Sequence, residues 1–201
     1  SFNLYAYVRN NPVSAVDPDG RKDNRTTEEK AVFEDPDVLL AMGLIIELTG
    51  YERPFADRWE AGVVILKVGE DDYTCPCVAT DGRLRSVRLT EPGEIENGVR
   101  VADGTSVFGT VHSHPGSGRV VEGGRRLGWT DPSKPSRADE NNAKARGVPS
   151  YIIDSNKRLI KYDPKTDRTT KVLTGKDWKK YQERAKRLVK VRSSDDLSKQ
   201  K

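Results

Sequence analysis

The chain has 201 residues, of which 34% are hydrophobic and 33% are charged. This length suffices for one domain of ordinary size with a real core and excludes two large domains. The longest apolar stretch, residues 38–48, is shorter than the roughly 20 residues that a membrane-spanning helix needs, so no membrane span is expected. The net charge of +4 permits contact with nucleic acid or acidic surfaces without requiring it.

Residues 1–20 contain two turn-forming motifs and a short aromatic segment. Asn-Asn-Pro at 10–12 and Asp-Pro-Asp-Gly at 17–20 favour turns, and Tyr-Ala-Tyr-Val at 5–8 can lie as a short strand. In this order they resemble the signature that closes the core of Rhs/YD-repeat proteins. The N-terminus has neither an initiating Met nor the plan of a signal peptide, so the chain is expected to be a piece of a longer protein.

That resemblance implies a biological context for the rest of the chain. In the Rhs family the core forms a shell, and the variable region after the signature is a toxin delivered into another cell by a secretion apparatus. The resemblance thus implies an effector encapsulated before release, and a cognate immunity protein as a partner. Because Arg21 follows Gly20 where related chains typically place a Leu, cleavage at that bond is not expected.

The next elements are expected in chain order from composition and periodicity. Residues 21–35 are charged and rich in turn formers, which is typical of a linker. Asp35 can then cap a helix over residues 38–48, and Gly50 can end it. Short β-rich runs separated by turn signals follow, then a helix near 136–146, and then two more strands. The expected strands cover residues 63–68, 73–79, 84–89, 106–112, 150–154 and 159–162.

This mixed order predicts an α+β fold rather than a doubly wound parallel sheet. The domain is expected to cover residues 36–175, with a basic helix or tail over 176–201. From Lys171 onward the chain is dense in Lys and Arg, with apolar residues at helical spacing. Because acidic residues interrupt this run, a solvated helix face is the preferred interpretation, and a nucleic-acid partner is not expected. Cys75 and Cys77 are too close for an unstrained disulfide and lack the pattern of a zinc site, so two thiols are expected.

The two histidines of the chain, His112 and His114, lie two residues apart at the end of an apolar run. On a strand, residues i and i+2 point to the same face, so both imidazoles can reach one ion. A catalytic zinc site needs three protein ligands and an open position. Asp139, at the start of the expected helix, is the preferred third ligand, with Asp131 as its rival.

His-Ser-His-Pro at 112–115 followed by Ser-x-x-Asp at 136–139 resembles the JAMM signature of JAB/MPN metallopeptidases. The resemblance implies that His112, His114 and Asp139 bind zinc, that Ser136 helps to hold the oxyanion, and that the fold is a cytidine deaminase-like mixed sheet flanked by helices. It also implies a glutamate as general base. Glu60 is the best match because it directly precedes an apolar strand, and the other upstream glutamates considered are Glu47, Glu52 and Glu70.

Residues 116–138 make the segment between the second histidine and the aspartate longer than in the family. A loop insertion can leave the geometry of the ligands intact. The preferred function is a toxin that hydrolyses amide bonds of a protein or peptide in the recipient cell. The alternatives are a metal-dependent nuclease and an inactive MPN-like binding domain. A zinc deaminase is disfavoured because its cysteine motif is absent.

Overall fold

The structure is a computed structural model that describes ten stretches of the chain. They are residues 25–69, 72–75, 78–80, 95–96, 99–100, 105–116, 120–122, 125–127, 133–155 and 158–198. The Rhs-like signature, the strand expected at 84–89, Glu70, Cys77 and Asp131 lie outside them.

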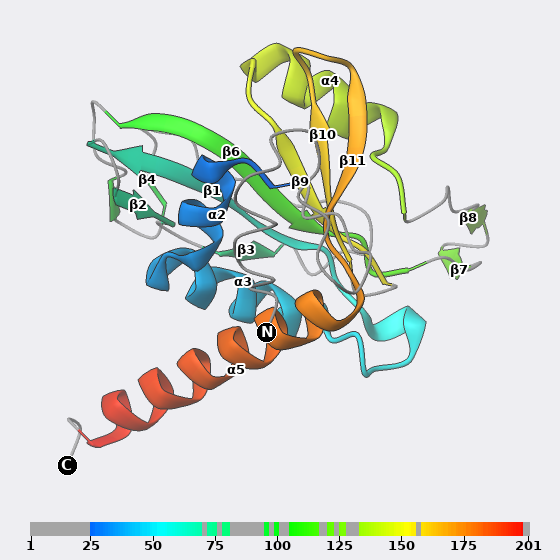
Figure 1. Ribbon diagram of the computed structural model, residues 1–201. Coiled ribbons are helices and arrows are strands. Elements are labelled where there is room, and N and C mark those ends of the chain that lie inside the picture. Colours follow the sequence, from blue (N-terminus) through cyan, green and yellow to red (C-terminus); the bar gives the residue numbers. More distant parts are fainter. Residues whose placement is uncertain are drawn as a thin grey trace, which may run out of the picture.

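A mixed seven-stranded sheet forms the centre of the molecule (Figure 1). Its strand order is β11-β10-β9-β6-β1-β2, with β3 also paired to β1. The β6–β9 pair is parallel, and the other pairs in this sheet are antiparallel. The strands are β1 (Ala61–Val68), β2 (Asp72–Thr74), β3 (Ala79–Thr80), β6 (Ser106–Ser113), β9 (Ser150–Ile153), β10 (Leu159–Asp163) and β11 (Arg168–Leu173).

Two small strand pairs lie apart from this sheet. They are β4 (Ile95–Glu96) with β5 (Val99–Arg100), and β7 (Val120–Glu122) with β8 (Arg125–Leu127). The second pair falls within the long segment between the two halves of the JAMM-like motif.

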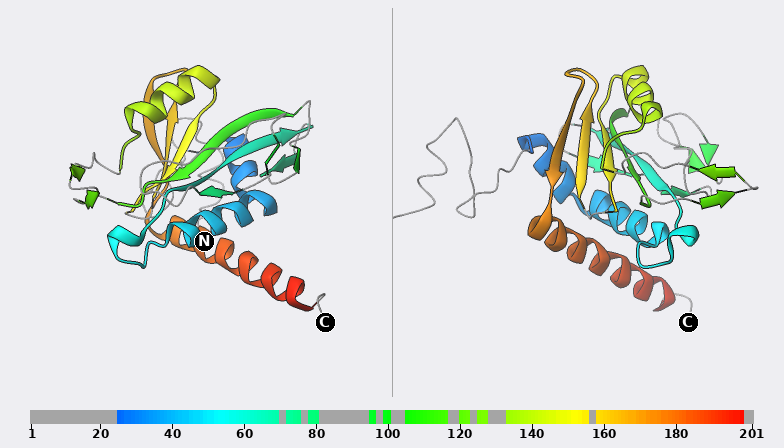
Figure 2. Two further views of the ribbon diagram at one scale, coloured as in Figure 1. Left: turned by 180° about the vertical axis from the view of Figure 1, so that it is seen from behind. Right: turned by 90° about the vertical axis from the view of Figure 1, so that its right-hand side faces the viewer.

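Helices cover both faces of the sheet (Figures 1 and 2). α3 (Pro36–Thr49) packs on β1 and β6 and against α5 (Gly175–Ser198), whereas α4 (Arg137–Arg146) lies against β9 and β10 on the other face. The predicted α+β class with a mixed sheet is therefore confirmed. None of the helices that the structure describes is long and apolar enough to cross a bilayer.

α3 has the two capping residues that the sequence indicated, Asp35 and Gly50, and is slightly longer than the predicted 38–48. The Asp35 carboxylate accepts hydrogen bonds from the backbone N–H groups of Asp37 (2.8 Å) and Val38 (3.2 Å), which satisfies two donors that an uncapped helix would leave free. Gly50 ends the helix in the left-handed conformation, with φ of 65°, which a residue without Cβ adopts at little cost.

The linker expected over residues 21–35 was wrong for its second half. α2 (Thr27–Glu34) is a helix with a Thr26 capping box, and Val32 and Phe33 are fully buried. The Phe33 ring makes an edge contact with Tyr151, at 5.0 Å between centroids. In the sequence, Val32 and Phe33 stand among charged residues, so their burial was not predicted. Two adjacent apolar residues are nevertheless enough to pack a short helix against a sheet.

The basic C-terminal helix expected from residue 176 is present as α5, and it packs more closely into the fold than a terminal helix or tail would. Residues 168–173 form the edge strand β11, and α5 begins at Gly175. Trp178, Tyr181 and Ala185 of α5 are buried in the main core. α5 is therefore part of the packed fold rather than a tail attached to it, because its apolar stripe covers α3.

Candidate metal centre

The two histidines lie at the end of the central strand β6. His112 pairs with Gly62 of β1 on one side and with Ile152 of β9 on the other. The backbone N–H of His114 donates to the carbonyl of Ile153 at 2.8 Å, which continues the parallel pairing past the end of β6. Both imidazoles therefore project from the same face of a strand held on both sides, and Gly62, the partner of His112 on β1, has no side chain to crowd it.

α4 presents Asp139 to these imidazoles. Ser136 caps the helix: its hydroxyl oxygen accepts from the Asp139 N–H at 3.2 Å, and the Asp139 carboxylate accepts from the Ser136 N–H at 2.6 Å. This reciprocal capping box fixes the rotamer of Asp139. The Ser-x-x-Asp spacing thus has a local structural reason, which also aims the carboxylate at the histidines.

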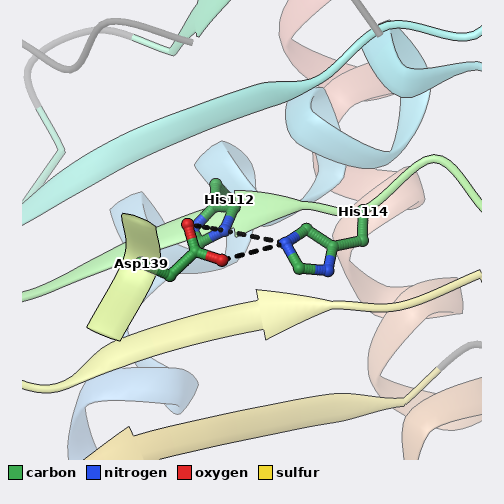
Figure 3. Close-up of side chains that lie close together, drawn as sticks. All are labelled: His112, His114 and Asp139. Atoms are coloured by element: carbon green, nitrogen blue, oxygen red, sulfur yellow. Dashed lines mark hydrogen bonds and ion pairs between the residues drawn. The ribbon is translucent and has the colours of Figure 1, made fainter. Parts of the chain in front are cut away.

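The three side chains converge on one point (Figure 3). Nε2 of His112 lies 3.2 Å from Oδ1 of Asp139, Nε2 of His114 lies 3.3 Å from Oδ2, and the two Nε2 atoms are 3.2 Å apart. Ligands at 2.0–2.1 Å from a tetrahedral zinc are separated by about 3.3–3.4 Å. Each of these separations matches that of two ligands of one tetrahedral zinc ion, and one ligand atom from each residue lies within 4.8 Å of the others, so the group could hold a metal ion.

The electrostatics of the group favour a shared cation. Burial acts to lower the pKa of His112, but the carboxylates of Asp139 and Glu60 raise it above its ordinary value. Burial acts to raise the pKa of Asp139, but the two imidazoles hold it well below its usual range. The carboxylate is therefore ionised at neutral pH, as a metal ligand must be.

A second layer under the histidine strand was not found from the sequence. Ser113, between the two histidines, points to the opposite face, where its hydroxyl lies 2.6 Å from that of Thr49 and accepts from the Ala61 N–H at 3.0 Å. Both hydroxyl-bearing residues are fully buried. These bonds connect the end of α3, the start of β1 and the end of β6, so they fix the strand that carries the ligands. The sequence did contain a signal for this role of Ser113: side chains alternate along a strand, so the residue between two histidines that share one face points to the opposite face, into the core.

The loop after α3 is tied to the same strand. The Tyr51 hydroxyl donates to the carbonyl of Ile153 at 2.7 Å, and burial raises its pKa well above the ordinary value. Nη1 of Arg58 donates to the carbonyl of Pro115 at 2.9 Å. These bonds hold two neighbours of His114: Ile153 of β9, whose carbonyl also accepts the His114 N–H, and Pro115, which follows it in the chain.

Of the three candidate glutamates that the structure describes (Glu47, Glu52 and Glu60), Glu60 is the one that the topology brings near the site. It precedes β1, and the antiparallel register of β1 with β6 continues to place it opposite His114, on the face of the two imidazoles. Its side chain is 8% exposed, and its charge acts on His112. Glu47 is exposed on α3, a helix that packs on the other face of the sheet, and Glu52 is exposed in the following loop.

Comparison with known proteins gives no relative: no protein-family model matches the chain, and no curated protein or solved structure matches it significantly. The class that fold and site define is therefore an α+β domain with a candidate metal centre of two histidines and one aspartate.

Proposed function

We propose that this chain is a zinc-dependent amide hydrolase of the JAB/MPN type, acting as a metallopeptidase or isopeptidase. The single observation that carries the proposal is the spacing of 3.2–3.3 Å among the ligand atoms of His112, His114 and Asp139. Two neutral imidazoles and one carboxylate form a ligand set of catalytic zinc, which leaves the fourth position for water or substrate. The surrounding seven-stranded sheet with helices on both faces is compatible with a JAB/MPN-like fold.

Two further residues of this chain have roles in that reaction. A bound zinc ion supplies Lewis acidity, which polarises a carbonyl and makes water a nucleophile near neutral pH. Glu60, on the face of the imidazoles, takes the proton of the attacking water and passes it to the leaving amine. The Ser136 oxygen accepts the Asp139 N–H, so its own proton is left to donate to the oxyanion that develops on the substrate.

The biological setting follows from the Rhs-like N-terminal signature. We propose that the domain is a toxin carried inside an Rhs shell, delivered by a secretion apparatus and neutralised in the producer by an immunity protein. A protein or peptide of the recipient cell is the substrate. A nuclease would use the same three ligands, so the reaction class needs a direct assay.

Metal analysis and toxicity of matched variants test the proposal. The wild-type chain should contain about one zinc ion, and Asp139→Ala should lose both zinc and toxicity. Glu60→Gln should keep zinc and lose toxicity, whereas the exposed control Glu52→Gln should keep both. Full toxicity of a zinc-free Asp139→Ala protein would refute the enzyme hypothesis. Zinc-dependent cleavage of nucleic acid without any cut protein in intoxicated cells would replace the peptidase with a nuclease.

A further inference from the structure

The outward face of α5 carries six cations, three on either side of Glu183. Successive residues of an α-helix are about 100° apart, so residues three, four and seven apart share a face. The buried stripe of α5 contains Trp178, Tyr181 and Ala185. On the opposite side, six exposed cations form what we call the basic stripe: Lys176, Lys179, Lys180, Lys186, Arg187 and Lys190.

Little acidic charge balances this stripe. Within its span Glu183 lies among the cations, whereas Asp177 is about 100° round the helix from Lys176. Among the residues that the structure describes, none of the six cations forms an ion pair, whereas the exposed cations Lys144 and Arg184 do. Arg184, one step off the stripe, is bonded to Glu34 of α2. Counting charges in the sequence cannot separate the paired cations from the unpaired ones, and it therefore suggested a solvated face with balanced charge.

The geometry points to the phosphate backbone of a nucleic-acid duplex as the partner of the basic stripe, bound without regard to sequence. From Lys176 to Lys190 the stripe runs about 21 Å along a straight helix, at 1.5 Å per residue. A duplex carries one negative charge per roughly 1.7 Å of its axis, so the basic stripe can contact phosphates along its whole length. Lysine, which supplies five of the six cations, binds phosphate as a point charge and does not read bases with a bidentate fork.

The same face argues against two other polyanions. Single-stranded nucleic acid is bound through stacking on aromatic side chains, but Trp178 and Tyr181 are turned inward and buried. An anionic membrane is bound by an amphipathic helix that inserts its apolar face, and in α5 that face is covered by α3.

α5 lies along the outside of the molecule, on the side of the sheet away from α4, and its C-terminal end extends beyond the other elements (Figures 1 and 2). Asp139 is presented from α4, so a duplex on the basic stripe leaves the candidate metal centre uncovered. The inference therefore stands independently of the proposed hydrolase.

Fluorescence anisotropy of a labelled DNA duplex of about 20 base pairs, titrated with the full chain, tests this inference. We expect binding that weakens between about 50 and 200 mM salt, with log K falling against log salt with a slope of about −4.5 to −5.4 for five or six phosphate contacts. The single strand of the same sequence should bind more weakly than the duplex. His114→Ala should leave the duplex affinity unchanged.

A pair of charge-matched triple variants separates the stripe from general basicity. Lys179→Gln with Lys186→Gln and Lys190→Gln should reduce the slope by about three and weaken binding at least tenfold at low salt. The control, Lys134→Gln with Lys165→Gln and Arg168→Gln, removes three exposed cations elsewhere and should change little. Equal loss in both variants, tighter binding of the single strand, or binding to anionic vesicles but not to duplex would overturn the proposal. So would duplex binding without salt dependence; an unchanged circular dichroism spectrum checks that each variant is folded.

Discussion

Replacing Glu29 by Gln is expected to destabilise the protein far more than the same change at its neighbour Glu28. The Glu29 side chain is 3% exposed and accepts three hydrogen bonds: from the Thr26 N–H (2.8 Å), the Tyr151 hydroxyl (2.9 Å) and the Lys161 ammonium (2.9 Å). These bonds join α2 to β9 and β10. Removing one partner of a buried ion pair costs about 3–5 kcal/mol, because the other charge is left without compensation.

Glu28→Gln is the matched control. Glu28 pairs with Lys67 at 2.9 Å, but its side chain is 52% exposed. Exposed pairs contribute about 0–1 kcal/mol, so the two variants should differ by at least 2 kcal/mol in the free energy of unfolding. Urea denaturation of both proteins, followed by tryptophan fluorescence at neutral pH, measures this difference. Equal midpoints and slopes for the two variants would refute the argument that burial of the Glu29 carboxylate anchors α2.

The stabilisation by the Glu29 carboxylate should depend on pH, in a direction that follows from its pKa. Burial acts to raise the pKa of Glu29, but Lys161 and the Thr26 N–H lower it below the ordinary value of 4.5. A lowered pKa means that the ionised carboxylate stabilises the folded state above the unfolded pKa, and that this contribution is lost as the pH falls through the folded value. The gap in stability between wild type and Glu29→Gln should therefore be constant near neutrality and narrow below about pH 4.5.

Three further predictions concern the packing of α5 and the candidate metal centre. Gly43→Ala would place a Cβ 2.7 Å from Cγ2 of Val189 and 2.8 Å from the carbonyl of Ala185. This change should lower the free energy of unfolding, measured by urea denaturation, by about 1–3 kcal/mol. Within a helix, Gly→Ala usually stabilises, so a gain in stability would contradict the close packing of α3 and α5. Ser136→Ala should lower the free energy of unfolding by about 1 kcal/mol and weaken zinc binding, because it removes the cap that orients Asp139. Ser136→Thr keeps the hydroxyl and should therefore retain wild-type stability and zinc binding. Zinc at 100-fold over its dissociation constant should raise the melting temperature by roughly 5–10 °C, and identical melting curves with and without chelator would exclude a bound metal.

Local patterns in the sequence were sufficient for the elements whose ends and periodicity are strong. The Asp35 cap and Gly50 marked the ends of α3, and the apolar run at 63–68 predicted the strand β1, because caps and short apolar runs act over a few residues. His-x-His on a strand likewise placed two imidazoles on one face. For these features the physical cause lies within one turn of helix or one strand.

Features that depend on a distant partner could not be seen in this way. The burial of Glu29 and Phe33 in α2 exists because β9 and β10 supply Tyr151 and Lys161, more than 100 residues later. A charged, short segment has no periodicity that distinguishes it from a linker until the surface that receives it is known.

The candidate metal centre depends on both kinds of information. The sequence by itself determined the ligand types and that Ser136 and Asp139 stand at capping spacing, since those are properties of single segments. Only the tertiary structure decided that α4 packs where the two oxygens of the Asp139 carboxylate lie 3.2 and 3.3 Å from the two imidazoles, and that Glu60 reaches the same face through the register of β1. Convergence of side chains from separate elements is set by the packing of α4 and β1 around β6, and no local pattern encodes that arrangement.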